Sequence, residues 1–217
     1  MQSFGQATKE ERNYIYKDSL QGYAQSIFFE TDKESIFYND ITRFEMRNFD
    51  QDSYTTSLKY LSSNKLSLQK RELILPSKEW LPLQQYHGEY YAYHPCDFYH
   101  FYKVSINDST YIDWTAEGAI ANKIIGQRKL NDSTYELSTK GILEQHRTIR
   151  ITLVDSISGI AVFEETTATK SPKYLLMIMA DKLKSVGFIV NVCITEKKSE
   201  LKFERPNFEK LLKMNKK

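Results

Sequence analysis

The densest group of chemically versatile side chains lies between His94 and His100. Imidazole, thiol and carboxylate groups are the usual protein ligands of zinc and other transition metals. His94, Cys96 and His100 are therefore the candidate metal ligands, with Asp97 between them. Their spacing matches no standard metal motif, and Pro95 and Asp97 suit an ordinary turn between strands equally well. We predict no metal and no other cofactor, and keep these three residues as the alternative.

Recognised catalytic patterns are missing from the rest of the sequence. It contains no nucleophile elbow, zincin helix, phosphate-binding loop or dinucleotide fingerprint. A catalytic triad would need one of the four histidines beside a serine and a carboxylate, and no spacing marks such a set. We therefore assign no catalytic residue, and an enzyme ranks third among the functions considered.

Aromatic residues are abundant, with 15 Tyr, 12 Phe and 2 Trp. They cluster on segments that we predict to be strands, where they could form the apolar wall of a ligand cavity. An inward-pointing arginine in such a cavity would suit an acidic head group such as a fatty-acid carboxylate. The alternative is that these rings simply fill the core. The candidate ligand-binding residues are Tyr90, Tyr99, Tyr102, Tyr111, Trp114, Arg147 and Arg150.

Turn-forming residues recur at regular intervals after Trp80. Asn107–Thr110 and Asn131–Thr134 are identical tetrapeptides 24 residues apart, and Asp155-Ser156 follows after another 24. Glycine-containing breaks at 117–118 and 140–141 fall between them. Asn, Asp and Ser favour tight turns because their side chains bond to nearby backbone. A turn about every 12 residues is the spacing of an all-β sandwich or barrel.

The segments between these turns alternate as strands do. Ile149, Ile151 and Leu153, for example, are separated by Arg150 and Thr152. We predict an α+β, mainly β fold, in which residues 80–206 form an antiparallel up-and-down meander of 8 to 10 strands closed as a barrel. The predicted strands lie near 87–94, 98–106, 110–116, 119–129, 133–139, 145–154, 159–166, 173–180 and 186–196, with a tenth at 199–205.

Residues 1–75 follow a different pattern. Apolar side chains recur at helical spacing from Tyr16 to Phe28, from Phe37 to Phe44 and from Tyr54 to Leu61. We therefore predict a mostly helical N-terminal segment. The alternative is a hairpin, because 26–29 and 35–38 carry strand-like residues on either side of a turn. Residues 65–82 are expected to be a linker, and 207–217 a helical or frayed tail.

Residues 86–91 carry a short motif with Tyr86, Gly88, Tyr90 and Tyr91. It resembles the lipocalin signature of an aromatic residue, a glycine two positions on, and a tryptophan two further on. Tyr90 stands where that family has tryptophan. In that family a late arginine packs on this ring, and the resemblance gives that role to Arg205. The resemblance implies a barrel of the calycin superfamily that binds a small ligand.

Charge and composition limit the possible binding partners and the cellular compartment of the protein. The net charge of +2 is too small to indicate binding to a nucleic acid. The sequence contains no run of 18 or more apolar residues, so it predicts no transmembrane helix. Residues 1–7 read either as the remnant of a signal peptide, which would place the protein outside the cytoplasm, or as an ordinary N-terminus. Cys96 and Cys193 are expected to be free thiols, since a bridge requires an oxidising compartment.

These observations rank two functions above an enzyme. The first is an extracytoplasmic, lipocalin-like protein that binds a small hydrophobic or amphipathic ligand. The second is a non-catalytic structural or interaction module whose barrel is filled and which engages a protein partner.

Overall fold

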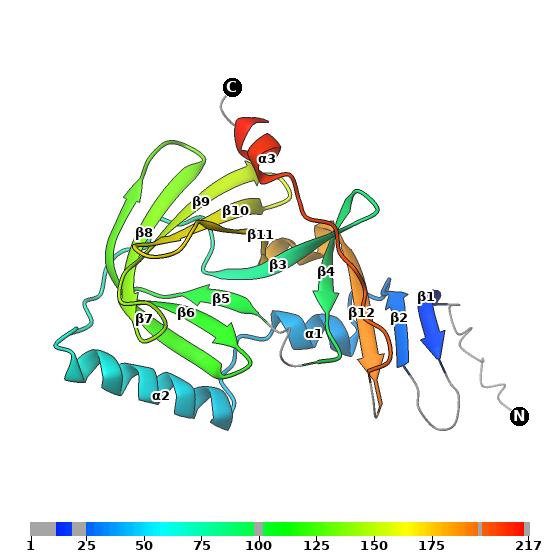
Figure 1. The fold of residues 1–217 in the computed structure, drawn as a ribbon, viewed down its shortest axis with the longest axis horizontal. Coiled ribbons are helices and arrows are strands. Elements are labelled where there is room, and N and C mark those ends of the chain that lie inside the picture. Colours follow the sequence, from blue (N-terminus) through cyan, green and yellow to red (C-terminus); the bar gives the residue numbers. More distant parts are fainter. Residues whose placement is uncertain (1–11, 19–24, 98–101, 195–196, 215–217) are drawn as a thin grey trace, which may run out of the picture.

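A computed structural model describes residues 12–18, 25–97, 102–194 and 197–214. Eight antiparallel strands form a closed barrel in the order β3-β11-β10-β9-β8-β7-β6-β5. Pairing of Trp80 with Val104 joins β3 to β5 and closes it. The closed up-and-down barrel predicted from the turn spacing is therefore confirmed (Figure 1). Its strands are β3 (Glu79–Tyr86), β5 (Lys103–Ile106), β6 (Thr110–Thr115), β7 (Gly118–Lys129), β8 (Thr134–Gly141), β9 (Arg147–Asp155), β10 (Ile160–Thr167) and β11 (Lys173–Met179).

Four further strands extend the sheet outside the barrel. The second half of β3 leaves the barrel wall and pairs with β4 (Glu89–His94). β12 (Gly187–Cys193) then pairs with β4 in parallel, and β2 (Gln25–Phe29) and β1 (Asn13–Asp18) follow. The predicted strands 87–94 and 186–196 thus do not belong to the barrel. The predicted tenth strand at 199–205 contributes one bridge, between Gln85 and Glu204.

The lipocalin-like motif occupies a hairpin turn and does not open a strand. Tyr86 ends β3, Glu89 begins β4, and the two residues between them form the turn. His87 and Gly88 both have positive φ, of 50° and 82°. Glycine takes this left-handed conformation without the steric penalty that a Cβ brings. Gly88 is therefore explained by the turn itself. Strand β3 begins at Glu79, so residues 79–82 of the predicted linker belong to a strand.

A mostly helical N-terminal segment is not supported. Residues 13–18 and 25–29 form β1 and β2, and helices begin only with α1 (Ile36–Thr42) and α2 (Asn48–Ser63). Phe28 is fully buried in β2, which lies between β1 and β12. Hydrogen bonding on both edges and burial on the sheet outweigh the helical spacing of this stretch. A short α3 (Phe208–Met214) lies near the C-terminal end.

Large side chains fill the interior of the barrel. The rings of Trp80 and Phe163 meet edge to face, with centroids 5.1 Å apart, and both residues are fully buried. Leu73 and Leu75, from the segment before β3, pack against this interior core. The interior core consists of Trp80, Val104, Ile106, Tyr111, Ile124, Tyr135, Leu137, Ile149, Ile151, Leu153, Ala161, Phe163, Met177 and Met179.

Helix α2 covers the outside of the barrel along β7 (Figure 1). Ser57 in this helix accepts a hydrogen bond from the backbone N–H of Ala121, at 2.9 Å. A Cβ on Gly118 would lie 2.6 Å from the Ser53 hydroxyl, so glycine permits the close approach of helix and strand. Trp114 faces this outer side and packs with Phe44.

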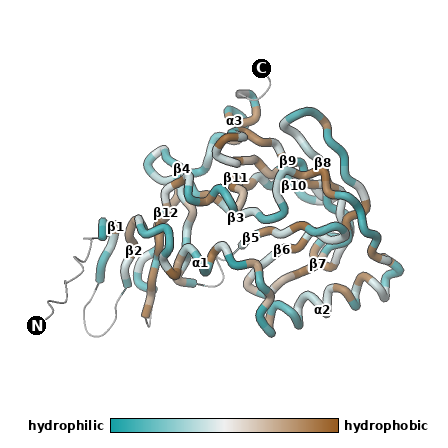
Figure 2. Tube along the Cα trace, turned by 180° about the vertical axis from the view of Figure 1, so that it is seen from behind, coloured by the Kyte–Doolittle hydropathy of each residue, from teal (hydrophilic) through white to brown (hydrophobic). Residues whose placement is uncertain are grey.

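A second core lies between the outer wall of the barrel and the extra strands. Phe28, Phe188 and Val190 from β2 and β12 pack there with Tyr38 and Ile41 of α1. Figure 2 shows β12 as hydrophobic along most of its length, as a strand buried on both faces requires. Beyond this core, Cys96 and Cys193 form a disulfide with their Cα atoms 5.4 Å apart. The expectation of free thiols is therefore wrong.

Candidate functional site

A buried polar cluster occupies the barrel end opposite Leu73 and Leu75. It contains Tyr102 and five residues whose exposed fractions are at most 8%. Strand alternation points these side chains inward, because each shares a face with residues of the interior core. Asp113, for instance, lies two residues from Tyr111 on β6. The five buried members of the cluster are Tyr111, Asp113, Asn122, Arg147 and Glu165.

Asp113 and Arg147 form the centre of this cluster. The two terminal guanidinium nitrogens donate to the two carboxylate oxygens, at 3.2 Å and 2.7 Å. The Tyr102 hydroxyl and the Asn122 amide also donate to Asp113, at 3.0 Å and 2.8 Å. Burial by itself would lower the pKa of Arg147, but the fields of Asp113, Tyr111 and Glu165 raise it. The arginine is therefore charged at every accessible pH.

Glu165 completes the cluster on the neighbouring strand. Its Oε2 lies 3.6 Å from Arg147 Nη1, while its Oε1 is buried and makes no hydrogen bond among the described residues. Arg147 Nε is also buried and makes no hydrogen bond to the described residues. Burial raises the pKa of Glu165, with Arg147 opposing this effect and Asp113 adding to it. Among the described residues the cluster thus leaves three buried polar atoms without a hydrogen-bond partner, namely Arg147 Nε, Glu165 Oε1 and the Tyr111 hydroxyl.

Tyr111 lies beneath the guanidinium group. The Arg147 Cζ stands 4.8 Å from the centre of the Tyr111 ring, which is fully buried. This places a cation over an aromatic face, where the ring quadrupole attracts it. Burial raises the pKa of both Tyr102 and Tyr111, so both hydroxyls stay protonated and can donate hydrogen bonds.

Charged side chains from the surrounding loops line the rim of this end. Lys170, in the β10–β11 loop, forms an ion pair with Glu144, in the β8–β9 loop. The Lys173 ammonium lies 5.3 Å from the centre of the Tyr102 ring. Leu143, beside Glu144, is 46% exposed. The rim therefore combines an apolar contact surface with charges of both signs.

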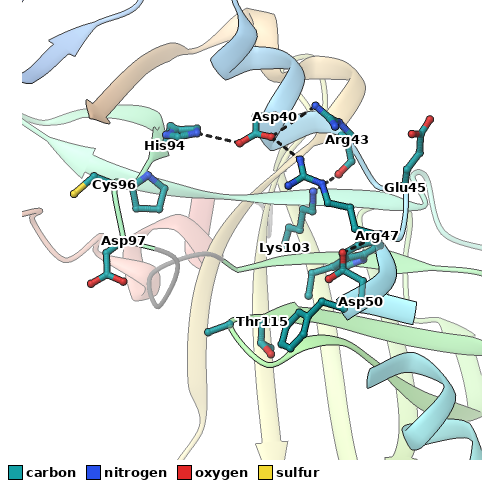
Figure 3. Close-up of a pocket in the computed structure, with 14 residues that line it drawn as sticks. Asp40, Arg43, Glu45, Arg47, Asp50, His94, Cys96, Asp97, Lys103 and Thr115 are labelled. Atoms are coloured by element: carbon teal, nitrogen blue, oxygen red, sulfur yellow. Dashed lines mark hydrogen bonds and ion pairs between the residues drawn. The ribbon is translucent and has the colours of Figure 1, made fainter. Parts of the chain in front are cut away.

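A hollow lies on the outside of the same barrel wall (Figure 3). It has a volume of about 440 Å³ and is lined by the α1–α2 connection, the end of β4 and the pair β5–β6. Asp40 lies at its upper edge, forms ion pairs with Arg43 and Arg47, and lies 3.3 Å from His94 Nε2. Lys103 and Trp114, cross-strand partners, face this hollow from the barrel. Their neighbours Tyr102 and Asp113 face the interior cluster.

Lys103 fastens the α1–α2 connection to the barrel. It is 3% exposed, and its ammonium donates to the backbone carbonyls of Ile41 and Arg43. The same ammonium lies 4.5 Å from the Phe44 ring centre and 5.1 Å from that of Trp114. Burial lowers the pKa of Lys103 to about 8, against the opposing fields of Asp40, Asp50 and Glu79. These contacts explain a structural role for this lysine.

The candidate metal ligands lie beside this outer hollow. Cys96 is engaged in the disulfide, so its sulfur is not a thiolate ligand. His94 Nε2 lies 3.3 Å from Asp40, and its ring meets the Phe37 ring edge to face. His100 lies outside the described residues. In the part of the chain that the structure describes, no group of three or more His, Cys, Asp or Glu side chains could hold a metal ion.

Three of the predicted ligand-binding residues come together in the interior cluster, namely Tyr102, Tyr111 and Arg147. Trp114 lies outside the barrel, and Arg150 is exposed on the outer face with Glu136 and Glu164. Tyr90 packs against the second core, away from the barrel interior. Tyr99 lies outside the described residues.

Sequence reasoning missed Asp113, Asn122 and Glu165. The alternation of side chains between the two faces of a strand could have identified Asp113. Tyr111 and Asp113 are two residues apart and share a face, whereas Tyr111 and Trp114 are three apart and cannot. Arg147 and Arg150 differ by three in the same way.

No family model, curated protein or solved structure matches this chain. None of the described helices has the length and apolarity needed to cross a bilayer. The site must therefore be interpreted from its own chemistry.

Proposed function

We propose that this chain is a non-catalytic, extracytoplasmic, lipocalin-like protein that binds a small amphipathic ligand at the polar end of its barrel. The architecture supports the lipocalin-like part of this proposal, because eight antiparallel strands close around an apolar interior core. The sequence motif does not contribute, since it forms a hairpin turn.

The buried cluster around Arg147 is the single observation that carries the proposal. Replacing a buried ion pair by apolar side chains of similar volume is often neutral or stabilising. Stability alone therefore does not account for an arginine, two carboxylates and two tyrosines at one end of an otherwise apolar barrel. The unpaired Arg147 Nε and Glu165 Oε1 add to this, because a buried polar atom without a partner is destabilising. A ligand that pairs with them explains their retention.

The filled interior limits where such a ligand lies. Trp80 and Phe163 occupy the space below the cluster, so the polar group of the ligand meets the cluster from the rim. Its apolar part then rests against the rim, where Leu143 and the half-buried Tyr102 offer contact surface. A ligand that enters here contacts Tyr102, which donates to Asp113, and Lys173, which lies beside the Tyr102 ring.

The disulfide supports an extracytoplasmic location. Cys96 and Cys193 close a loop across 97 residues of sequence. Such bridges persist in oxidising compartments and are rare in the cytosol. Residues 1–7, which suggested a signal-peptide remnant, lie outside the described residues.

A filled barrel favours the alternative, a structural or interaction module. Tyr111, Phe163 and Ile151 in the interior core are all fully buried. If they leave no room for a ligand even at the rim, the barrel acts as a rigid support, and the extra strands or helices engage a protein partner.

Titration with a neutral fluorescent probe, N-phenyl-1-naphthylamine, separates the two functions. The binding proposal predicts saturable one-to-one binding that Arg147→Met weakens and Arg150→Met leaves unchanged. The two variants are matched, because both arginines lie on β9 and only Arg147 faces inward. No saturable binding to the folded wild type, or equal loss in both variants, would favour the filled module. Circular dichroism of each variant verifies that it is folded.

A further inference from the structure

We propose that the polar group of the ligand is uncharged and both donates and accepts hydrogen bonds, as a hydroxyl or a carboxamide does. This inference rests on the proposed binding function and assigns the chemical class of the ligand. It differs from the acidic head group that an inward-pointing arginine suggests at first.

The guanidinium group of Arg147 is already committed to carboxylates. Both terminal nitrogens donate to Asp113, and Nη1 also lies 3.6 Å from Glu165. Bidentate pairing with Asp113 occupies the end-on fork of the two terminal nitrogens, and Asp113 also accepts from Tyr102 and Asn122. A ligand carboxylate that used this fork would have to displace Asp113, and one placed at Nε would bring a third negative charge into a cluster that already holds Asp113 and Glu165. Nε is the guanidinium nitrogen of Arg147 that has no hydrogen-bond partner among the described residues.

Ionised groups at this end of the barrel balance one another. Asp113, Glu165 and Glu144 are acidic, and Glu144 lies close enough to Glu165 to influence its pKa. Arg147, Lys170 and Lys173 are basic and face the same three acids or the Tyr102 ring. The region therefore offers no net charge to compensate for the desolvation of an ionised head group. An uncharged polar group has a much smaller desolvation cost.

The unpaired atoms specify the hydrogen-bonding pattern. Arg147 Nε can only donate, the Glu165 carboxylate oxygen Oε1 accepts, and the unpaired Tyr111 hydroxyl can do either. A ligand carboxylate only accepts and an ammonium only donates, so each leaves one of the first two atoms without a partner. A hydroxyl or a carboxamide satisfies both. Arg147 Nη1 lies 3.6 Å from Glu165 Oε2, so the two unpaired atoms belong to neighbouring groups of the cluster.

A series of ligands with one saturated chain and four head groups tests this inference. Dodecanol, dodecanamide, dodecanoate and dodecylammonium are titrated at neutral pH in competition with the fluorescent probe. We expect the alcohol and the amide to bind about tenfold or more tightly than either ion, because an ion leaves a buried atom unpaired and loses its own hydration. Tighter or equal binding of either ion would overturn the head-group inference and leave the binding function standing. Failure of all four to displace the probe would overturn both.

Glu165→Gln provides an internal test on the same site. Removal of this negative charge leaves three positive groups and two negative groups at this end of the barrel, so the affinity for dodecanoate should rise relative to dodecanol. Glu164→Gln is the matched control, because Glu164 lies one residue earlier on β10 and faces outward to Arg150. An unchanged preference in Glu165→Gln, or the same change in Glu164→Gln, would overturn the proposed role of the cluster.

Discussion

Replacing Asp113 by asparagine keeps the shape of the side chain and removes its charge. The carboxylate is 1% exposed and accepts hydrogen bonds from Tyr102, Asn122 and both terminal nitrogens of Arg147. After the change, the nearest carboxylate to the buried guanidinium is Glu165, at 3.6 Å. Breaking a buried pair by removal of one partner typically costs about 3–5 kcal/mol. We expect Asp113→Asn to lower the free energy of unfolding by about that amount.

Urea unfolding of the oxidised protein at neutral pH measures this loss, with tryptophan fluorescence as the signal. The Trp80 ring lies inside the barrel and Trp114 on its outer wall, so both report on barrel integrity. Asp132→Asn is the control, since Asp132 is a fully exposed turn residue, and its unfolding free energy should match that of the wild type. A loss below about 1 kcal/mol in Asp113→Asn would refute the description of a desolvated ion pair.

Four further changes extend the test to other parts of the molecule. Burial lowers the pKa of Lys103 to about 8 from 10.5, so the unfolded state binds more protons than the folded state between these two pH values. The free energy of unfolding of the wild type should therefore rise relative to that of Lys103→Gln as the pH increases through this window. A difference in urea unfolding that stays constant with pH would contradict this. Burial raises the pKa of Glu165, so ionisation there is unfavourable to the fold, and Glu165→Gln should be more stable than the wild type at neutral pH, with the gap closing as pH falls through the raised pKa toward the ordinary carboxyl value. Replacement of Cys96 and Cys193 by serine should lower the free energy of unfolding by about 2–4 kcal/mol, and reductant should then no longer alter the melting temperature. Gly141→Ala places a Cβ 2.1 Å from the Asn122 side-chain oxygen and should cost about 1–3 kcal/mol, whereas an unchanged melting curve would show that Asn122 is not fixed against Asp113.

The barrel strands were predictable because their boundaries depend on local residues. The strands expected at 119–129, 145–154 and 173–180 differ by at most two residues at either end from β7, β9 and β11. Asn107–Thr110 illustrates the reason, since the Asn107 side chain accepts from the backbone N–H groups of Ser109 and Thr110. Such bonds fix a turn within four residues of sequence.

The extra strands were not predictable in the same way. Burial of β12 and its parallel pairing with β4 depend on residues about 95 positions apart, which no local pattern records. The disulfide follows from this pairing, because Cys96 lies just beyond the end of β4 and Cys193 ends β12. Without the pairing, nothing in the sequence placed the two sulfurs together.

The candidate site was predictable in part. Arg147, Tyr102 and Tyr111 were among the candidates chosen by residue type, and Asp113 was visible from its parity with Tyr111. The partners on other strands were not, since the register that sets Glu165 within reach of Arg147 is fixed by pairing between β9 and β10. Selecting Trp114 by its aromatic character alone ignored the face on which it lies.

Nuclear magnetic resonance of the arginine Nε–H groups tests the central claim most directly. The Arg147 signal, assigned by its loss in Arg147→Met, should shift on addition of dodecanol and saturate with one equivalent. The Arg150 signal should stay in place. A ligand that binds without shifting the Arg147 signal would contradict the account, because it would place the ligand away from the buried cluster.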